Sequence, residues 1–357
     1  MLHDTRRTPC QSPAVLLLRD VRKSDLPALR SLARVLNSVN LPADERALSV
    51  IIERSVRSFS GRIADPWKRS YVFVLEDTAR RRVLGTSMVI AQHGTRESPC
   101  TFLDVTERES YSSTLDRHFR HQVLSIGFHF DGPTEIGGLV VDPKARGSEA
   151  EPGKQLSFVR FLYMAIFPDR FRETVLAELM PPLRSDGKSL FWEGFGRRFT
   201  GLDYQEADKL SRKGKEFIQQ LFPAGEFYAT LLPPRVQQAL GKVGRSTEPA
   251  RRMLSRIGFR YVNRIDPFDG GPHHEAKLSE VSLVREHRRL RLENEPLRAG
   301  GRDPEVLAGV VRAAGTNRFR AVRTRARVSG DAVRLPVEAC RALDVKPGGA
   351  IHLVPFA

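Results

Sequence analysis

The sequence predicts an α/β (α+β) fold with mixed, mostly antiparallel sheets and a small β-rich region at its C-terminal end. Patterns of strand, helix, helix and hairpin follow one another between Val15 and Ala91. An apolar strand at Glu135–Val141 then stops at Asp142-Pro143 and leads through a polar loop into a helix. Short strand patterns return near the C-terminal end. Together these three observations indicate a layered α/β core with a β-rich appendage.

The N-terminal elements follow from the spacing of apolar residues. A strand is predicted at Val15–Val21, and a helix begins after Asp25, a residue suited to the N-cap. A second helix is predicted at Asp44–Phe59, because leucine and isoleucine recur there at helical spacing. Tyr71–Glu76 and Val83–Ala91 are rich in strand-forming residues and are separated by a charged turn, so we expect a hairpin.

The segment after Glu135–Val141 is the strongest candidate for a binding site. Arg146-Gly147 begins a polar loop that ends at Gly153-Lys154, where an apolar-periodic helix starts. Loop glycines let backbone N–H groups approach phosphates, and a helix N-terminus supplies positive potential, so this arrangement suits a pyrophosphate. The exposed edge of such a strand can bind an amide-bearing chain as an added strand does. An ordinary strand-to-helix connection is the alternative interpretation.

The net positive charge of the chain is typical of nucleic-acid-binding proteins, but the distribution of the basic residues does not favour that function. The 357 residues carry a formal net charge of +16, with a dense arginine stretch from Arg285 to Arg327. That stretch lacks the interleaved aromatic residues of a single-strand-binding surface. A basic surface would equally attract a polyanionic molecule such as coenzyme A. No apolar run approaches the roughly 20 residues of a membrane span, so we expect a cytoplasmic protein with no membrane partner.

The cysteines and histidines indicate no metal site. Cys10, Cys100 and Cys340 lie far apart without metal-ligand spacing, and buried or incidental thiols are favoured over a catalytic one. His273-His274 follows a glycine-rich segment and is expected in a solvent-exposed loop. Three further histidines are expected to be incidental, the first two on one helical face and the third in a strand-like run: His118, His121 and His129.

A set of local motifs then points to a family. They include Leu41–Asp44, Ser189–Glu193, Gly196–Phe199, Asp203–Asp208, Gly258–Tyr261 and, most distinctive, Ile265–Pro272. On these motifs the chain resembles the arginine N-succinyltransferase family over roughly residues 15–290. The resemblance implies a GNAT-like acyltransferase core that moves the succinyl group of succinyl-CoA to the α-amine of arginine. It implies no permanently bound cofactor, acyl-CoA and a small amine such as arginine as partners, and possible homo- or hetero-oligomers.

Such a reaction needs a base for the amine, donors for the tetrahedral oxyanion and an acid for the leaving thiolate. By resemblance, a backbone N–H near Leu139 serves the thioester carbonyl. The cofactor-binding set that the resemblance implies combines the central strand with its loop: Leu139, Val140, Val141, Arg146, Gly147, Gly153 and Lys154. Glu178 and Asp186 fall in the stretch that the resemblance places near the amine, where carboxylates suit a guanidinium. The alternative for both is that they are solvent-exposed surface carboxylates with no role in binding.

The chain departs from the family where chemistry is expected. The family pattern Gln-Val-His-Pro-Gln-Thr carries a proton-donating histidine, and Gly244 takes that position here. A second family histidine is also missing, and the loop after the central strand is about two residues longer and carries Glu149 and Glu151. As substitutes we expect Tyr228 as the acid and Glu226 as the base, against the alternatives of a packing tyrosine and an exposed carboxylate.

These features predict four parts of the chain. Residues 1–13 form a tail, residues 14–165 a GNAT-like acyl-CoA-binding half, and residues 166–294 a second half that completes the cleft. Residues 295–357 hold a linker and the β-rich region, with strands at Ala332–Pro336 and Ile351–Val354 and a helix at Val337–Leu343. The leading prediction is an N-acyltransferase. The alternatives are a homologue that kept the fold without the chemistry, and a nucleic-acid-associated protein acting through its basic tail.

Overall fold

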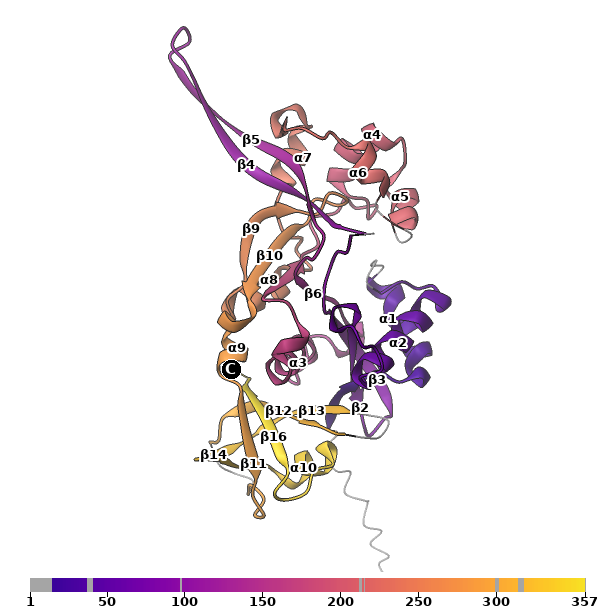
Figure 1. The fold of residues 1–357 in the computed structure, drawn as a ribbon, viewed down its shortest axis with the longest axis vertical. Coiled ribbons are helices and arrows are strands. Elements are labelled where there is room, and N and C mark those ends of the chain that lie inside the picture. The colour runs from indigo at the N-terminus through magenta and orange to yellow at the C-terminus, as the bar shows by residue number, and fades with distance from the viewer. Residues whose placement is uncertain are drawn as a thin grey trace, which may run out of the picture.

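The structure is a computed structural model that describes residues 15–36, 41–96, 98–211, 214, 216–298, 302–313 and 318–356. Within these residues, sixteen strands form one continuous mixed sheet, and most neighbouring strands run antiparallel (Figure 1). The predicted fold class is confirmed. The predicted tail at residues 1–13 lies outside the described residues. The strand order along the sheet is β14-β15-β11-β16-β12-β13-β1-β2-β3-β6-β7-β10-β9-β4-β5-β8.

The N-terminal half has the elements that the sequence predicts. They are β1 (Leu16–Asp20), α1 (Leu26–Leu36), α2 (Glu45–Phe59), β2 (Ser70–Asp77), β3 (Arg82–Ile90), β6 (Thr134–Val141) and α3 (Pro152–Ile166). A strand that the sequence did not predict follows, β7 (Thr174–Glu178). Asp44 caps α2 by accepting a hydrogen bond from the N–H of Ala47 at 2.8 Å. Val72 and Val74 of β2 pack with α1 and α2, whereas Tyr71 and Phe73 pack with α3. The two helix layers therefore cover opposite faces of the sheet.

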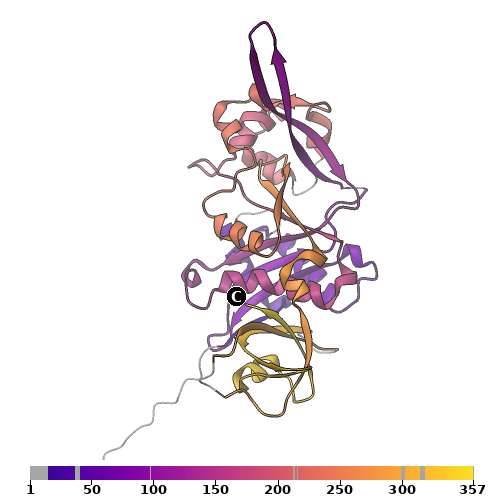
Figure 2. The ribbon, with the colours of Figure 1, turned by 90° about the vertical axis from the view of Figure 1, so that its left-hand side faces the viewer.

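A long β-hairpin that the sequence did not predict leaves the body of the molecule. β4 (Cys100–Ser112) and β5 (Arg117–His129) have 13 residues each and project beyond the helices beside them (Figures 1 and 2). His118 and His121 lie on strand β5, so the helical face expected for them is wrong. Because the outer part of the hairpin is exposed, its side chains show no apolar alternation that would predict a strand.

The middle of the chain adds three further strands to the sheet and a group of helices. They are α4 (Arg197–Thr200), α5 (Tyr204–Ser211), α6 (Glu216–Leu221), β8 (Phe227–Tyr228), α7 (Pro234–Ala239), α8 (Glu248–Arg256), β9 (Arg260–Ile265), β10 (Pro272–Lys277) and α9 (Ser282–Arg285). A single turn of π-helix at Trp192–Gly196 precedes α4. Trp192 is fully buried, and its indole N–H donates to the carbonyl of Leu202 at 3.0 Å. Trp192 also belongs to a buried cluster with Ala207, Ile218 and Val236, which joins α5, α6 and α7.

The expectation of a solvent-exposed loop at His273-His274 is wrong. Both residues lie in β10, which is paired with β7 on one side and β9 on the other. Only 1% of His273 and 5% of His274 is exposed. The cause is tertiary: the strand is central in the sheet, so both faces are covered although its local sequence is polar. A pair of histidines buried in a central strand is costly unless it is hydrogen-bonded or functional.

The C-terminal region is joined to the first strand of the chain. It holds β11 (Arg288–Leu292), β12 (Glu305–Val311), β13 (Phe319–Arg325), β14 (Arg327–Ser329), β15 (Ala332–Arg334), α10 (Val337–Leu343) and β16 (Ala350–Pro355). The predicted helix is confirmed with the same bounds. β13 pairs with β1, where Leu18 lies opposite Ala321. The fully buried Phe319 also packs against Phe73 and Tyr163 of the main core. The predicted division into four parts therefore stays a prediction, with the sheet continuous across it.

Short 3-10 turns connect several of these elements. They cover Lys23–Asp25, Pro66–Lys68, Pro143–Ala145, Pro168–Arg170, Ala229–Leu231 and Leu278–Glu280.

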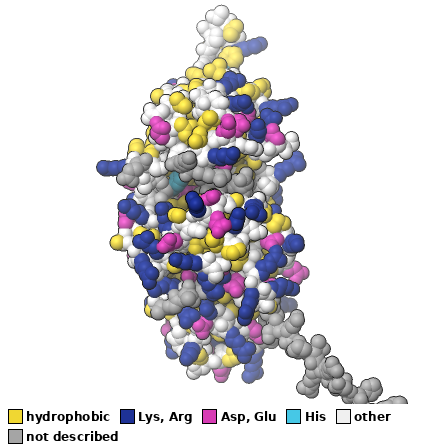
Figure 3. All heavy atoms as spheres, turned by 90° about the vertical axis from the view of Figure 1, so that its right-hand side faces the viewer, with side chains coloured by type: hydrophobic (Ala, Val, Ile, Leu, Met, Phe, Trp, Pro, Cys, Tyr) yellow, Lys and Arg dark blue, Asp and Glu magenta, His cyan; other side chains and the backbone are white. Residues whose placement is uncertain are grey.

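The surface carries no large field of one sign on the face shown in Figure 3, where Asp and Glu lie among Lys and Arg. Several arginines of the dense stretch are engaged in ion pairs within the chain: Arg312 with Asp344, Arg323 with Glu305, and Arg327 with Asp303. In the part of the chain that the structure describes, no helix is both long and apolar enough to cross a bilayer.

Candidate functional site

The sheet opens between its two central parallel strands. β6 and β7 share just two register pairs, Thr134 with Val175 and Glu135 with Leu176. Beyond Glu135 the described residues of the two strands are no longer paired with each other, although β3 still pairs with the other edge of β6. The backbone of β6 from Gly137 onward therefore faces a gap in the sheet. An extended, amide-bearing ligand can bind such an edge in the way an added strand does.

A β-bulge shapes β6 at the start of this gap. The register between β3 and β6 shifts between Thr86 and Met88. Opposite this shift, Gly138 has φ +57°, and a Cβ atom there would lie 2.9 Å from Cγ of Met88. Glycine is needed for both reasons. Bulges twist a strand locally and re-aim its groups, and this one precedes the predicted binding residues Leu139, Val140 and Val141.

The loop after β6 has the strand–loop–helix form that the sequence predicts. Asp142 accepts a hydrogen bond from the N–H of Lys144 at 2.9 Å and so fixes the turn after the strand. Gly147 has φ +70° with open space around it, and α3 begins at Pro152. Gly153 lies in the first turn of α3 with Lys154 next to it. Four of the predicted binding residues lie in this loop and the first turn of α3, and their role in binding stays a prediction: Arg146, Gly147, Gly153 and Lys154.

The C-terminal region holds this loop from outside. Arg323 of β13 donates a hydrogen bond to the carbonyl of Glu149 at 2.9 Å, and its guanidinium lies 3.4 Å from the carboxylate of Glu151. Lys154 donates to the carbonyl of Phe356 at 3.1 Å. The two acidic residues of the loop are therefore not both free to repel a phosphate, since Arg323 offsets the charge of Glu151. The last strands of the chain position the loop.

A cluster of ionisable side chains lies at the point where β6 and β7 separate. Nδ1 of His93 lies 2.8 Å from a carboxylate oxygen of Glu135, whose side chain is 2% exposed. Nε2 of His273 lies 3.6 Å from Glu178. Potential ligand atoms of His93, Cys100 and Glu178 lie within 4.8 Å of one another, as do those of Glu178, Asp266 and His273. Glu178 therefore links two groups that come from five different segments of the chain.

Electrostatics couples the two members of the closest pair. Burial lowers the pKa of His93, but the charge of Glu135 and hydrogen bonds to Cys100 and Glu135 outweigh it. The net result is a pKa of His93 well above its ordinary value near 6.5. At neutral pH the pair therefore carries one proton, with a positive imidazolium beside a negative carboxylate.

This pair makes stability depend on pH, and we expect His93→Gln to show it. A raised pKa in the folded state stabilises the fold fully below the unfolded value near 6.5, and that contribution is lost as the pH rises through the folded value. Urea denaturation should therefore show a larger loss of unfolding free energy for His93→Gln at pH 6 than at pH 9. His118→Gln, a change at an exposed ring, is the matched control. Equal losses at both pH values would contradict the pairing.

The predicted acid and base lie elsewhere in the sheet. Tyr228 lies on β8 opposite Val123 of β5 and is 40% exposed. Glu226 is exposed and pairs with Arg108 of the hairpin at 2.6 Å. Six strand positions separate β8 from β6, which is about 29 Å at the usual spacing of strands. The structure therefore does not bring these two residues together with the gap, and their roles stay predictions.

The two carboxylates predicted to bind the substrate, those of Glu178 and Asp186, lie in different surroundings. Glu178, at the end of β7, belongs to the ionisable cluster. Asp186 lies in an exposed turn, where its carboxylate is 3.3 Å from Arg184 and accepts from the N–H of Lys188. No contact among the described residues joins Asp186 to Glu178. Glu178 is the one that the fold brings to the gap between β6 and β7.

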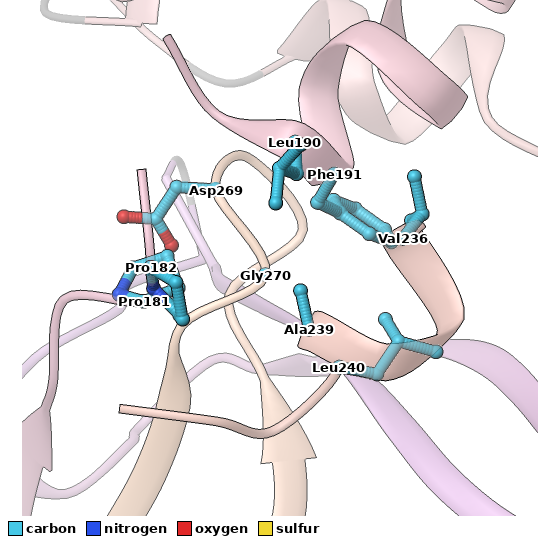
Figure 4. A pocket seen from close by; sticks show the side chains of 9 residues that line it. All are labelled: Pro181, Pro182, Leu190, Phe191, Val236, Ala239, Leu240, Asp269 and Gly270. Atoms are coloured by element: carbon cyan, nitrogen blue, oxygen red, sulfur yellow. The ribbon is translucent and has the colours of Figure 1, made fainter. Parts of the chain in front are cut away.

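Gly244 lies close to the end of β7. Its N–H donates to the carbonyl of Met180 at 2.9 Å, and a Cβ atom there would lie 2.7 Å from the carbonyl oxygen of Pro181. A side chain therefore does not fit at this position in the present backbone. Next to it is a shallow apolar hollow, shown in Figure 4. It is lined by Pro181, Pro182, Leu190, Phe191, Val236, Ala239, Leu240, Asp269 and Gly270.

Sequence reasoning missed His93, Cys100, Glu135 and His273 as members of one site. Their convergence depends on strand order, which places β10 beside β7 and the end of β3 beside β6. One signal was present in the sequence. Glu135 is a carboxylate in an otherwise apolar strand, and a charge that is buried without a structural partner nearby in sequence indicates a functional site.

Comparisons with known proteins agree with this architecture. Residues 16–283 match the family model described as "Arginine N-succinyltransferase beta subunit". An arginine N-succinyltransferase of Escherichia coli is 33% identical over 344 residues, which are 95% of this chain and 97% of that protein. The solved structure of arginine/ornithine succinyltransferase subunit AI from Pseudomonas aeruginosa is 29% identical with a TM-score of 0.80. The match covers 96% of this chain and 99% of that one.

Proposed function

The chain belongs to the arginine N-succinyltransferase family and is an acyl-CoA-dependent acyltransferase, and on this premise we propose that it transfers a succinyl group from succinyl-CoA to the α-amine of arginine. The observation that carries the proposal is the gap between β6 and β7 with the loop at residues 142–153 at its end. The gap suits the amide-bearing pantetheine arm, and the loop with the N-terminus of α3 suits the pyrophosphate.

In the proposed reaction the backbone of β6 stabilises the transition state. In the transfer, the amine nitrogen attacks the thioester carbon, and negative charge develops on the carbonyl oxygen. A backbone N–H of Leu139, just after the bulge at Gly138, would donate to that oxygen, with Val140 and Val141 continuing the edge along pantetheine. Arg146, Gly147, Gly153 and Lys154 would form the end of the site that receives the phosphates. Glu178 would attract the cationic amine, and Asp186 stays a predicted second carboxylate.

The two alternatives are not favoured by the family comparisons. A homologue without chemistry would keep the gap and the loop but release no thiol. A nucleic-acid-associated protein would need a basic surface free of partners, whereas Arg312, Arg323 and Arg327 are paired within the chain. Association into homo- or hetero-oligomers also stays a proposal, which light scattering of the purified chain would test.

Release of free thiol tests the proposed reaction. The full chain is incubated with succinyl-CoA or acetyl-CoA and with arginine, ornithine or lysine, and thiol is followed by a colorimetric reagent. We expect succinyl-CoA with arginine to give the highest kcat/KM. Higher turnover with acetyl-CoA or another amine would replace the substrate assignment, and absence of release with all pairs would refute the activity.

The contact between Arg323 and the loop predicts that loss of this side chain weakens the binding of succinyl-CoA without slowing turnover. Arg323→Ala should raise the KM for succinyl-CoA by a few-fold to about tenfold, since a partly exposed pair contributes about 1 kcal/mol and tenfold corresponds to about 1.4 kcal/mol. The kcat should stay near that of the wild type, because Arg323 contacts the loop and not the gap. Arg341→Ala on α10 is the matched control. A raised KM for arginine instead would contradict this role.

A further inference from the structure

The pair of His93 and Glu135 lies at the one place in the sheet where reacting groups would meet. Glu135 and Leu176 form the last register pair before β6 and β7 separate. Neighbouring residues on β6 face opposite sides of the sheet, and Ile136 packs in the core that contains α3. The side chain of Glu135 therefore points to the other face, at the inner end of the gap.

Further ionisable side chains lie near Glu135 on that face of the sheet. Glu178 follows Leu176 by two residues on β7, so both point to the side of Glu135. His273 is the register partner of Glu178 on β10. Cys100 from the start of β4 and Asp266 after β9 complete the surroundings of the two pairs. Five segments thus bring ionisable groups to the end of the gap, away from the α3 core.

We propose that the His93–Glu135 pair handles the proton in acyl transfer, in place of the histidine that the family pattern puts at Gly244. This rests on the proposed function. The pair lies at the inner end of the gap, and the chain lacks the family histidine. At Gly244 the chain lacks the side chain and also the room for one, because a Cβ atom would lie 2.7 Å from the carbonyl oxygen of Pro181.

The proton transfers of the acyl-transfer reaction can be carried out by His93 and Glu135 together with solvent. The ammonium of the substrate releases a first proton to solvent, and the neutral nitrogen forms the C–N bond with the thioester carbon. The remaining extra proton on nitrogen passes to the carboxylate of Glu135. The C–S bond breaks with its electron pair on sulfur, and the imidazolium of His93 gives its proton to that thiolate. Solvent then takes the proton from Glu135 and returns one to the ring nitrogen of His93 that gave its proton, so the pair begins and ends with one proton.

The second pair has a supporting role in this arrangement. A quarter of the Glu178 side chain is exposed, so it remains reachable by a cationic amine, whereas the side chain of His273 beside it is buried. His273 is a positioning residue, because it contacts Glu178 and faces no open surface. The carboxylate of Glu178 would hold the substrate nitrogen on the face where Glu135 receives its proton. Cationic substrate, carboxylate and proton acceptor thus lie on one side of the sheet.

Four variants of the full chain test the proposal, with kcat, the KM for succinyl-CoA and melting temperature measured for each. We expect His93→Gln and Glu135→Gln each to lower kcat about 10²–10⁴-fold, the usual contribution of general acid–base catalysis. The KM for succinyl-CoA should change less than about twofold, since neither residue contacts the loop. The double variant should be about as slow as either single one, because the two act as a unit. His118→Gln on the hairpin is the control and should keep wild-type kcat.

The pH dependence separates a role in proton transfer from a structural one. The charge of Glu135 raises the pKa of His93, so Glu135→Gln should move the alkaline limb of the kcat profile to lower pH. Titratable groups around the pair that are left in place are Cys100, His129, Glu178, Asp266 and His273. A structural defect would lower the melting temperature and leave the position of that limb unchanged, which would overturn the proposal.

Two other outcomes would also overturn it. One is wild-type kcat in Glu135→Gln together with a loss of kcat in Tyr228→Phe and Glu226→Gln, which would place the proton transfer at β8. The other is an acyl group on Cys100 detected by mass spectrometry during turnover. Absence of activity in the wild-type chain would refute the proposed function itself. That outcome is recognised before any variant is measured, so it is distinct from a failure of the proposal about His93 and Glu135.

Discussion

Replacement of Gly138 by valine is expected to abolish most of the activity while the chain still folds. The backbone at Gly138 has φ +57°, a conformation that valine adopts only with strain of about 1–3 kcal/mol. The new side chain would also meet Met88, since Cγ of Met88 lies 2.9 Å from the Cβ position. The strand must relax by changing the bulge, and the N–H of Leu139 then loses its direction.

Loss of one oxyanion donor usually lowers kcat about 10²–10³-fold, and we expect Gly138→Val to fall in that range. Gly330→Val is the matched control, because Gly330 has φ +59° with nothing within 4 Å of its Cβ position, in the turn between β14 and β15. The control has similar backbone strain far from the gap, so it should lower the melting temperature and keep kcat. Equal kcat in the two variants would show that the bulge has no part in the reaction.

Replacement of Phe319 by alanine is expected to destabilise the whole chain. Phe319 begins β13 in the C-terminal region, is fully buried, and packs against Phe73 of β2 and Tyr163 of α3. Removal of a buried phenylalanine side chain costs about 3–5 kcal/mol, because the remaining cavity collapses only in part. Since that ring joins the C-terminal strands to the main core, urea denaturation should show one transition at lower urea.

Phe119→Ala is the matched control for this change. Phe119 is 40% exposed on the projecting hairpin, so its removal should alter the unfolding free energy by less than about 1 kcal/mol. Two separate transitions in Phe319→Ala, with the main core unaffected, would show that residues 295–357 are an independent unit. That result would support the predicted division of the chain and contradict the joint core.

The parts of the fold that the sequence predicted are those with local signals. The apolar strand at Glu135–Val141 is β6 with one more residue, and the helix at Val337–Leu343 has the predicted bounds. Asp44 caps α2 as its residue type indicates. In each case the residues within about one helical turn or one strand determine the structure, so no knowledge of distant contacts is needed.

The parts that it did not predict depend on partners far away in sequence. The outer hairpin of β4 and β5 has polar residues on both faces, so period-two alternation is absent where the strands leave the sheet. His273 and His274 are buried only because β7 and β9 flank β10. His93 and Glu135 are 42 positions apart in the sequence, and the pairing of β3 with β6 brings them together.

The loop after β6 could be predicted from the sequence, whereas the roles of its residues stay predictions. Arg146, Gly147, Gly153 and Lys154 are close together in the sequence, so one loop and the first turn of α3 hold them. Substitutes for a lost histidine can come from any strand that reaches the gap. Tyr228 and Glu226 are close in sequence to the family pattern, whereas the order of the sheet places β8 six positions from β6.

A crystal structure of the chain with coenzyme A and arginine tests the central claim most directly. We expect pantetheine in the gap between β6 and β7, hydrogen-bonded to the backbone from Leu139 to Val141, with the pyrophosphate on the loop at residues 142–153. The thiol end should then point toward Glu135, with the amine of arginine on the side of Glu178. Coenzyme A bound on another surface, with β6 and β7 unoccupied between them, would contradict the account.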